Sequence, residues 1–273
     1  MPTSARPRRR APRAERAAVR VIVTRPAAQA ADWVAQLCAH AIDAVALPLI
    51  GIAPVADPAD LHATWRGLKE HRLAIFVSPN AAEQFFAQRP SGAAWPPALL
   101  AGSPGPGTTR VLVQLGVPPE HIVEPAADAP QFDSESLWVQ LRAHDWRAAS
   151  VLIVRGDGGR DWLAQTLAAA GAQIAYATAY RRIAPAFEAT ETSLLRAALA
   201  EPGAHLWFFS SSEAIDHLVA SPIVGAGADW GRASAITTHP RIAARARQSG
   251  FACVTEARPS LAAVVACIQS LRP

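Results

Sequence analysis

The stretch V-L-I-V-R-G-D-G-G-R, residues 151–160, runs directly into D-W-L-A-Q-T-L-A-A-A-G, residues 161–171. The first four residues form an apolar run that predicts a buried strand, and the apolar spacing after Asp161 predicts a helix. That helix is expected to end at Gly171, because glycine favours the left-handed conformation that closes many helices. A buried strand followed by a helix predicts an α/β fold with a parallel sheet.

The turn between this strand and this helix is rich in glycine. A dinucleotide-binding turn requires G-x-G-x-x-G, but counting from Gly156 and Gly158 the third glycine position is occupied by Asp161. A P-loop requires Gly-Lys followed by Ser or Thr, and the only lysine of the chain is Lys69. The sequence therefore matches neither nucleotide fingerprint, although free N–H groups ahead of a helix still favour an anion.

The same strand–helix unit recurs along the chain. Apolar runs that predict strands occupy residues 19–24, 73–77, 151–154, 205–209, 233–237 and 251–254. Helical patterns end at residue 40 and occupy 79–88, 161–170, 211–220, 240–249 and 259–271, with two more starting near Thr108 and covering 132–143. Asp133 or Ser134 is suited to cap the helix over 132–143. Residues 44–54 are extended but contain two prolines, which suits a connector better than a central strand, and residues 173–184 are extended up to Pro185.

The composition is that of a globular chain. With 273 residues, of which 51% are hydrophobic, it is long enough for two domains with a core each. It has no run of eighteen apolar residues, so no membrane-spanning segment is expected. Cys38, Cys253 and Cys267 are far apart, and we expect them to be small buried residues of a protein in a reducing compartment, the cytoplasm. Neither a disulfide framework nor a metal site is expected.

The net charge of +4 is unevenly distributed. Residues 1–20 contain seven arginines and one glutamate, a balance of +6, which leaves −2 for the rest of the chain. Residues 1–18 form an Arg/Pro-rich arm without apolar periodicity, which is typical of disorder. A tether for nucleic acid is one interpretation of this arm, and a solvated extension or a start codon placed too early is the simpler one. The arm lacks the apolar core of a secretory signal.

The turns that follow the strands are the candidate site, because ligands of open parallel sheets bind beyond the C-terminal ends of the strands. These turns are residues 24–26, 78–80, 105–108, 155–156, 210–212 and 237–240, and all but the Arg-Gly turn contain a Ser or Thr hydroxyl. Helix capping alone explains many such hydroxyls. The segments I-F-V-S-P-N-A-A-E-Q-F-F (75–86) and W-F-F-S-S-S-E-A-I-D-H-L (207–218) are similar, which predicts two similar α/β lobes.

A series of short motifs occurs in a fixed order between residues 19 and 270. The motifs are V-T-R-P, P-L-I-x-I, F-V-S-P-N-A, G-P-G-T, F-D-S-E-S-L, V-R-G-D-G-G-R-D-W-L, A-Y-R-R, F-S-S-S-E-A and H-P-R-I-A. In that order and spacing the chain resembles the uroporphyrinogen-III synthase family. No single motif is diagnostic, so the resemblance depends on the series.

The resemblance implies two α/β lobes, each a parallel sheet flanked by helices, joined by a two-stranded β connector with the active site between the lobes. Transferred to this chain, the first lobe comprises residues 19–45 plus 184–273 and the second lobe residues 46–183, with connectors at 46–54 and 179–185. The activity implied is that of a cofactor-independent cyclising lyase of haem biosynthesis. It converts the linear tetrapyrrole hydroxymethylbilane into uroporphyrinogen III and water, with inversion of the last pyrrole ring.

The resemblance also implies roles for individual residues. Tyr180 is expected to assist loss of hydroxide from the substrate, with packing as the alternative, and Tyr176 is expected to pack. The glycine-rich turn, residues 156–159, is expected to hold carboxylates or pyrrole edges through backbone N–H groups. Arg160 is expected to add charge there or to pair with a neighbouring Asp, and His239 to cap a helix or line the cleft. The expected substrate-binding residues are Thr24, Arg25, Ser78, Asn80, Thr108, Arg155, Gly156, Gly158, Ser211, Ser212 and Thr238.

Three other interpretations stay open. A non-catalytic two-lobed module that binds a small anion would share the fold, and a nucleic-acid-associated protein would use the arm at residues 1–18. A nucleotide-dependent enzyme would need a fingerprint that the chain lacks. The expected partners are the linear tetrapyrrole substrate and, transiently, hydroxymethylbilane synthase, with no nucleic acid, membrane, metal or organic cofactor. We expect a monomer, because closure of two lobes requires no partner chain.

Overall fold

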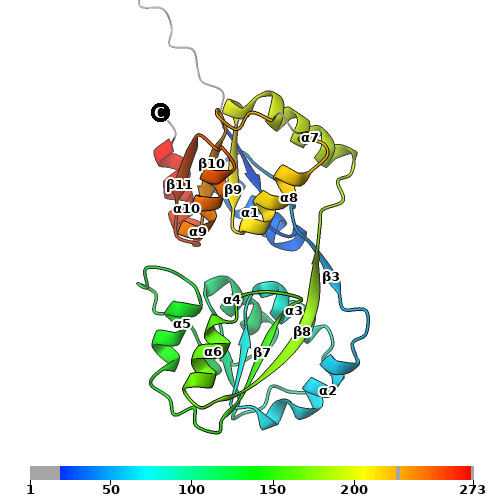
Figure 1. Ribbon diagram of the computed structural model, residues 1–273, viewed down its shortest axis with the longest axis vertical. Helices are drawn as coiled ribbons and strands as arrows, with labels where there is room; N and C mark the ends of the chain where they lie inside the picture. The colour runs from blue at the N-terminus through cyan, green and yellow to red at the C-terminus, as the bar shows by residue number, and fades with distance from the viewer. Residues whose placement is uncertain (1–18, 226–227, 272–273) are drawn as a thin grey trace, which may run out of the picture.

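The computed structural model describes residues 19–225 and 228–271 as two lobes (Figure 1). The first lobe, at the top of Figure 1, contains a sheet with the order β11-β10-β9-β1-β2, in which every neighbouring pair is parallel. Its strands are β1 (Arg20–Val23), β2 (Ala44–Ala46), β9 (His205–Phe209), β10 (Ser234–Thr237) and β11 (Cys253–Glu256). Its helices are α1 (Ala27–Ala39), α7 (Ala189–Ala200), α8 (Ser212–Ala220), α9 (Pro240–Gln248) and α10 (Leu261–Leu271), with a 3-10 turn at Pro202–Ala204.

Both faces of this first sheet are buried, which explains why its strands are continuous apolar runs. Neighbouring residues of a strand point to opposite faces. On the central strand β9, Trp207 accordingly packs in one core cluster and Phe208 in the other. Trp230 and Phe251 complete the first of these clusters, with ring centroids 4.8 Å apart. The apolar run at 205–209 therefore forms the middle of the lobe.

The second lobe contains a sheet with the order β3-β8-β7-β4-β5-β6, parallel except for the pair β3–β8. Helices α2, α3 and α4 contribute to one core cluster, and α5 and α6 to the other. The strands are β3 (Gly51–Pro54), β4 (Leu73–Phe76), β5 (Leu100–Gly102), β6 (Ile122–Val123), β7 (Ser150–Gly156) and β8 (Gln173–Ile183). The helices are α2 (Ala59–Gly67), α3 (Pro79–Phe86), α4 (Pro106–Gln114), α5 (Ser134–Leu141) and α6 (Trp162–Ala169), with 3-10 turns at Leu68–Glu70 and Pro119–His121.

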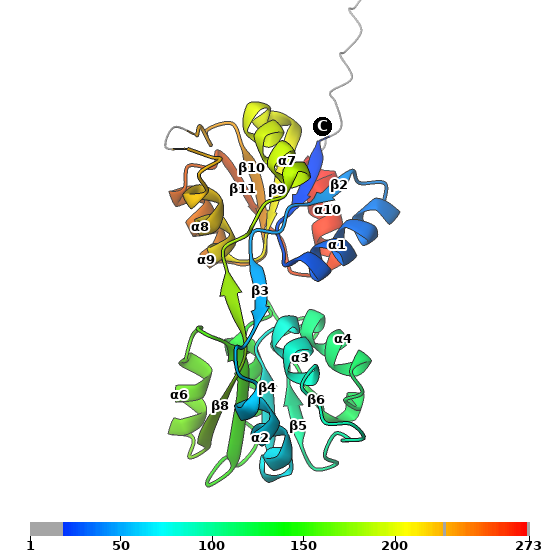
Figure 2. The ribbon, with the colours of Figure 1, turned by 90° about the vertical axis from the view of Figure 1, so that its right-hand side faces the viewer.

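Two extended segments cross between the lobes and run side by side (Figure 2). β3 pairs antiparallel with the end of β8, with Gly51 opposite Ile183 and Pro54 opposite Tyr180. A side chain at Gly51 would bring its Cβ within 2.6 Å of Ile183, so the close pairing requires glycine. β3 lies at the edge of its sheet, where a proline is tolerated. The predicted two-stranded connector is therefore present.

The predicted two-lobed α/β fold is confirmed, and the differences are local. The strand and helix at 151–170 form β7 and α6, and Gly171 has φ +97 as expected of a helix end. The sequence patterns miss β5 and β6, which are too short for alternation to show, and α2 and α7, which bury two residues each. β11 begins at Cys253 and not at residue 251, because Phe251 packs against Trp230.

The prediction of buried cysteines is wrong for two of the three. Cys38 and Cys253 are exposed and Cys267 is half-buried, and all three are free. Cys38 lies beside the buried Leu37 but on the outer side of α1, and Cys253 begins an edge strand. The arginine-rich arm at 1–18 lies outside the described residues, and the domain boundaries at 45/46 and 183/184 stay a prediction.

Candidate active site

Residues that follow the strands of one lobe contact their counterparts in the other lobe. Asn80 follows β4, Glu213 follows β9 and His239 follows β10, so the C-terminal ends of strands from both sheets face one region. We call this the inter-lobe region; it is where open α/β sheets bind their ligands. Polar contacts that join the lobes here include Gln29–Asn80, Arg182–Glu213, Asp133–His239 and Arg258 with the backbone of Ala127 and Ala129.

Tyr180 lies near the end of β8 and is 1% exposed. Its hydroxyl is 3.2 Å from Oγ of Ser78 and accepts a hydrogen bond of 3.4 Å from Nη2 of Arg182. A Cβ at Gly156 would lie 2.9 Å from the ring carbon Cζ of Tyr180, which only glycine avoids. Gly156 was expected to cradle a ligand; in the structure it leaves room for the Tyr180 ring.

Arg182 connects Tyr180 to the other lobe. Residues two apart on a strand point to the same side, and the Arg182 guanidinium lies 5.9 Å from the Tyr180 ring centroid. Its Nη1 donates to Oε2 of Glu213, on α8 of the first lobe, at 3.1 Å. Burial lowers the pKa of Arg182, but Tyr180 and Glu213 raise it by more, so the pKa lies above its ordinary value. The guanidinium is therefore held in its charged form beside the phenol oxygen.

Ser78 and Asn80 precede and begin α3. The Ser78 hydroxyl accepts a hydrogen bond from the Ala81 N–H at 3.1 Å, so it caps the helix as well as contacting Tyr180. Asn80 accepts a hydrogen bond from Gln29, on α1 of the first lobe, at 2.9 Å. Both predicted residues thus lie in the inter-lobe region.

The glycine-rich turn, residues 156–159, places its backbone beside Tyr180 and leaves its tip open. The Asp157 N–H donates to the Tyr180 carbonyl at 3.1 Å, and nothing lies within 4 Å of a Cβ built on Gly158. Gly159 has φ +147, a conformation that side chains disfavour. Five residues, 157–161, separate the end of β7 at Gly156 from the start of α6 at Trp162.

The two arginines that flank this turn are both paired with carboxylates. Arg155 donates to Asp161 at 2.5 Å and lies 4.6 Å from the ring centroid of Tyr176. Arg160 forms two hydrogen bonds with Glu135 on α5, of 2.6 and 3.0 Å, whereas an Asp neighbour was the expected partner. A small pocket lies between the sheet and α5 and α6 and is lined in part by these two arginines.

The Ser and Thr residues predicted to bind substrate differ in burial and in whether their hydroxyls hydrogen-bond to the backbone. Thr24 is buried and its hydroxyl donates to the Phe208 carbonyl at 2.8 Å. Thr108 and Thr238 are also buried, in the first turn of α4 and just ahead of α9. Ser211 holds the N-cap position of α8 without a capping hydrogen bond, and Ser212 is the first residue of that helix. The Ser211 hydroxyl is therefore not used to cap α8.

Arg25 follows β1, and its guanidinium lies over two neighbouring aromatic rings. Its guanidinium carbon lies 5.0 Å from the ring centroid of Trp33 and 5.7 Å from that of Phe208. Its Nε is buried and has no hydrogen-bond partner among the described residues. Burial and, secondarily, the charge of Arg110 on α4 of the second lobe lower the pKa of Arg25 to about 10.

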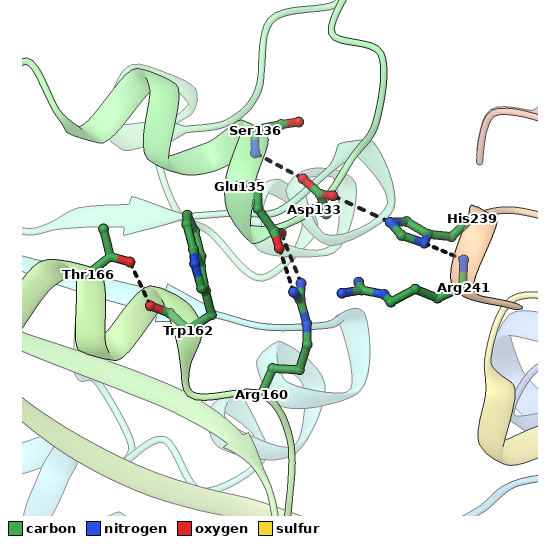
Figure 3. A network of polar contacts seen from close by, with 8 residues as sticks. All are labelled: Asp133, Glu135, Ser136, Arg160, Trp162, Thr166, His239 and Arg241. Carbon is green, nitrogen blue, oxygen red and sulfur yellow. Dashed lines mark hydrogen bonds and ion pairs between the residues drawn. The ribbon is translucent and has the colours of Figure 1, made fainter.

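A second group of contacts joins the lobes around Asp133 and His239 (Figure 3). Asp133 caps α5 by accepting from the Ser136 N–H at 2.9 Å, and its other oxygen lies 3.5 Å from Nε2 of His239. His239 caps α9, because its Nδ1 accepts from the Arg241 N–H at 3.1 Å. With its Nδ1 bound to the Arg241 N–H, His239 turns its Nε2 toward the Asp133 carboxylate.

Arg258 extends this second group. It donates to the carbonyls of Ala127 and Ala129 at 2.9 and 2.6 Å, and its guanidinium lies 5.0 Å from the Phe132 ring centroid. The loop ahead of α5 is thereby attached to the first lobe.

Sequence analysis did not single out Arg110, Asp133, Arg182 or Glu213 as site residues. Arg182 could have been found from the sequence, because it lies two positions after Tyr180 on an extended segment, so the two side chains must point to the same side of the strand. The other three depend on which turns of the two lobes face each other, and no local pattern reveals that. Between residues 19 and 271, apart from 226 and 227, no group of three or more His, Cys, Asp or Glu is placed to hold a metal ion. In the same part of the chain, no helix is long and apolar enough to cross a membrane.

The fold and the site together define a class: a two-lobed α/β protein with an antiparallel strand pair between the lobes and polar residues of both lobes at the C-terminal edges of the sheets. The profile of the family described as uroporphyrinogen-III synthase HemD matches residues 31–266. The chain therefore belongs to the uroporphyrinogen-III synthase family, whose members are enzymes of tetrapyrrole biosynthesis.

Individual relatives agree with this assignment. The uroporphyrinogen-III synthase of Synechococcus elongatus is 26% identical over 238 residues, which cover 85% of this chain and 84% of that protein. The uroporphyrinogen-III synthetase structure from Helicobacter pylori has a TM-score of 0.55 at 16% identity and covers 93% of this chain and 100% of its own. A mutant uroporphyrinogen III synthase from Thermus thermophilus has a TM-score of 0.53 at 16% identity, with coverages of 93% and 98%. At such identities the two structures show a shared fold.

Proposed function

We propose that this chain closes hydroxymethylbilane into a ring with inversion of the last pyrrole ring, giving uroporphyrinogen III and water. The observation that carries the proposal is the family match over residues 31–266. The inter-lobe region supports it, because two lobes that meet through side-chain contacts can enclose a large flexible chain. In this proposal the reaction uses no metal or organic cofactor.

The reaction needs a proton donor at one end of the substrate. The hydroxymethyl carbon loses hydroxide, which leaves with one proton as water, and the first ring becomes an electron-poor azafulvene. A carbon of the last ring attacks it to give a spiro intermediate. That intermediate fragments and recloses with the ring inverted, and loss of a proton restores the aromatic pyrrole.

Tyr180 is the proposed donor to the leaving hydroxide. Its hydroxyl accepts from Arg182, which leaves its own proton available for Ser78 or for a substrate oxygen. The positive charge of Arg182 stabilises the negative charge that develops on the phenol oxygen as the proton leaves. Because Tyr180 is 1% exposed, the leaving group has to approach it past Ser78 and Arg182.

The remaining polar groups are proposed to hold the acetates, propionates and pyrrole edges of the substrate. The proposed donors are the Ser211 hydroxyl, which forms no capping hydrogen bond, and backbone N–H groups at the open tip of the glycine-rich turn. Thr24, Thr108 and Thr238 contribute through the turns that they hold in place. Arg155 and Arg160 can exchange their present carboxylate partners for those of the substrate.

The enzyme must direct the folding of the substrate as much as it accelerates bond breaking. Closure without inversion gives isomer I. A thousandfold preference for isomer III corresponds to only about 4 kcal/mol between the two transition states. Fixing reacting groups in place contributes about 7–11 kcal/mol in favourable cases. A site that acts mainly through positioning is therefore sufficient in magnitude.

The second candidate function is a two-lobed module that binds an anion without turnover. Arg155 and Arg160 in the pocket of the second lobe favour this function, because two positive charges can bind an anion without catalysing a reaction. We further propose that the enzyme is a cytoplasmic monomer which receives its substrate in transient contact with hydroxymethylbilane synthase.

Product analysis tests the proposed function. Freshly made hydroxymethylbilane is incubated with the full chain without added cofactor, the product is oxidised, and isomers I and III are separated by chromatography. Predominant isomer III is the expected result. Isomer I at the spontaneous rate, alongside an active control synthase, would exclude the synthase activity and favour the binding module.

A further inference from the structure

The ion pair between Arg182 and Glu213 crosses from one lobe to the other beside Tyr180. Arg182 lies on β8, and Glu213 lies in the first turn of α8 in the first lobe. Nη1 of Arg182 donates to Oε2 of Glu213 at 3.1 Å, and Nη2 of the same guanidinium donates to the Tyr180 hydroxyl at 3.4 Å. One guanidinium therefore contacts a carboxylate of one lobe and the phenol of the other lobe at the same time.

The phenol itself is held by the second lobe alone. The Tyr180 ring packs against Gly156, where a Cβ would lie 2.9 Å from Cζ, and its hydroxyl lies 3.2 Å from Oγ of Ser78. Tyr180 is on β8, Gly156 ends β7 and Ser78 follows β4, and these strands are neighbours in one sheet. Separation of the lobes would therefore leave Tyr180 in place but withdraw Glu213 from Arg182.

The contact with Tyr180 alone holds the Arg182 guanidinium weakly. In the described part of the chain, Tyr180 is the only side-chain acceptor of this guanidinium besides Glu213, and the hydrogen bond to it is longer than usual. The distance of 5.9 Å to the ring centroid is near the outer limit of a cation–π contact. Both side chains of the ion pair are 33% exposed, so a guanidinium released by Glu213 is free to turn into solvent.

We propose that Glu213 is a positioning residue for the proton donor: when the lobes close, Glu213 of the first lobe fixes the Arg182 guanidinium beside the Tyr180 hydroxyl. This inference rests on the proposed function, since that function supplies the acceptor of the proton. With the lobes apart, the guanidinium is no longer fixed and the phenol is a poorer donor. Loss of hydroxide from the substrate therefore follows closure of the lobes around it.

The proton transfer at Tyr180 shows why the position of the guanidinium matters. The phenol O–H bond breaks, and the proton joins the departing hydroxide, which leaves as water with the electron pair of its C–O bond. The phenol oxygen is then negative, and the nearby charge of Arg182 stabilises it. The proton that the last ring releases at the end of the reaction restores the phenol.

The test uses substitutions in the full chain. Glu213→Ala removes the anchor of Arg182, and Glu213→Gln keeps an acceptor of the same reach without the charge. Asp216→Asn is the matched control, because Asp216 lies later on the same helix and forms an ion pair of 2.6 Å with Arg245 inside the first lobe. The double variant Tyr180→Phe/Glu213→Ala shows whether Glu213 acts through Tyr180.

The turnover number and KM are measured with hydroxymethylbilane as the substrate. We expect Glu213→Ala to lower the turnover number about tenfold without a change in KM, because a misplaced group affects the transition state and Glu213 does not bind the substrate. Glu213→Gln is expected to lose about fivefold, since a neutral acceptor binds a guanidinium more weakly than a carboxylate does. Asp216→Asn is expected to match the wild type. In Tyr180→Phe, the further change Glu213→Ala is expected to have no effect.

An NMR signal reports the position of Arg182 without any turnover. Tyrosine labelled with ¹³C at Cζ gives two signals, because the chain contains two tyrosines, and Tyr180→Phe identifies the signal of Tyr180. The chemical shift responds to charges and hydrogen bonds at the phenol oxygen. We therefore expect Glu213→Ala to move the Tyr180 signal but not that of Tyr176, and Asp216→Asn to move neither.

A turnover number of Glu213→Ala within about twofold of the wild type, or an unmoved Tyr180 signal, would overturn the positioning role. So would an equal loss in Asp216→Asn, or a loss in the Tyr180→Phe background as large as in the wild type. If thermal unfolding shows that Glu213→Ala is not folded at the assay temperature, Glu213→Gln replaces it in each comparison.

The proposed function is judged separately, by the product isomer of the wild type. Isomer I alone would exclude the synthase activity and, with it, the role of Glu213. Isomer III together with any of the contrary results above would retain the function and exclude the role of Glu213 alone.

Discussion

Asp133 and His239 cap helices in different lobes and contact each other, with Oδ2 and Nε2 3.5 Å apart. They are 13% and 20% exposed, respectively, so the contact is largely covered. The strand pair β3–β8 joins the lobes elsewhere, at residues 51–54 and 180–183. The lobes are therefore held together by covalent connectors at one place and by a separable side-chain contact at another.

The first prediction concerns this contact. Asp133→Ser keeps a favoured N-cap residue but removes the oxygen that reaches His239, so we expect the lobes to separate more readily with little loss of helix stability. Asp133→Ala removes the cap as well, which is expected to cost about 0.5–2 kcal/mol of stability. Small-angle scattering reports separation and urea unfolding reports stability. An unchanged radius of gyration for Asp133→Ser would show that the contact does not hold the lobes.

The second prediction tests the role of Tyr180. Tyr180→Phe removes the hydroxyl but keeps the ring that packs beside Gly156, so folding is expected to persist. The turnover number is expected to fall by about a hundredfold or more, as for loss of a general acid. Tyr176→Phe is the matched control, because Tyr176 is 48% exposed and is not proposed to donate a proton to the substrate. Equal turnover of Tyr180→Phe and the wild type would assign Tyr180 to packing alone.

The third prediction separates two glycines of one turn. Gly156→Ala puts a methyl group 2.9 Å from the Tyr180 ring, so the ring must shift, and we expect a loss of about 1–3 kcal/mol in stability together with lower turnover. Gly158→Ala meets nothing within 4 Å and is expected to leave unfolding free energy unchanged or slightly higher. Urea unfolding measures the stability of each variant, and steady-state kinetics measures its turnover number. Equal effects at the two positions would contradict the assignment of Gly156 to the ring.

The fourth prediction is a pH dependence. Hydrogen bonds from Arg160 hold the pKa of Glu135 at about 2, below its ordinary value of 4.5. A lowered pKa contributes stability that is fully present above about pH 4.5 and is lost as the pH falls toward about 2. Because the two side chains are 41% and 42% exposed, solvent limits the contribution to about 1 kcal/mol or less.

Unfolding by urea at pH 6 and pH 3 checks this dependence. Arg160→Gln is expected to lose more stability at pH 6 than at pH 3, where part of the contribution is already gone, so the difference between the two pH values narrows. Arg142→Gln, which breaks no ion pair, is expected to keep the wild-type difference. If Arg160→Gln keeps the same difference in unfolding free energy between pH 6 and pH 3 as the wild type, other carboxylates cause that difference.

The fold was largely predictable because its signals are local. The apolar run at 151–154 and the glycine at 171 mark one strand–helix unit, and the same pattern recurs in both lobes. The short strands β5 and β6 were not predictable, since they form by pairing along the sheet, β5 with β4 and β6 with β5. The crossing of the chain between the lobes came from the family resemblance and not from periodicity.

The candidate site was predictable only in part. Turn positions identified Ser78 and Asn80, which do lie in the inter-lobe region. Substrate binding by Gly156 stays a prediction; what the sequence did not reveal is that glycine there leaves room for the Tyr180 ring, which belongs to the next strand. Contacts such as Arg182–Glu213 could not be read from sequence, since they depend on how two separately folded sheets are oriented.

Tyr180 occupies a special place on β8. It is the residue where pairing with β7 ends, opposite Gly156, and where pairing with β3 begins, opposite Pro54. If the lobes rotate about this strand pair, Tyr180 lies close to the axis, and points near an axis travel less than points far from it. The phenol would then keep its position relative to either lobe at any angle of opening. The lobes could thus open to admit a bulky substrate without moving the phenol that is proposed to donate the proton.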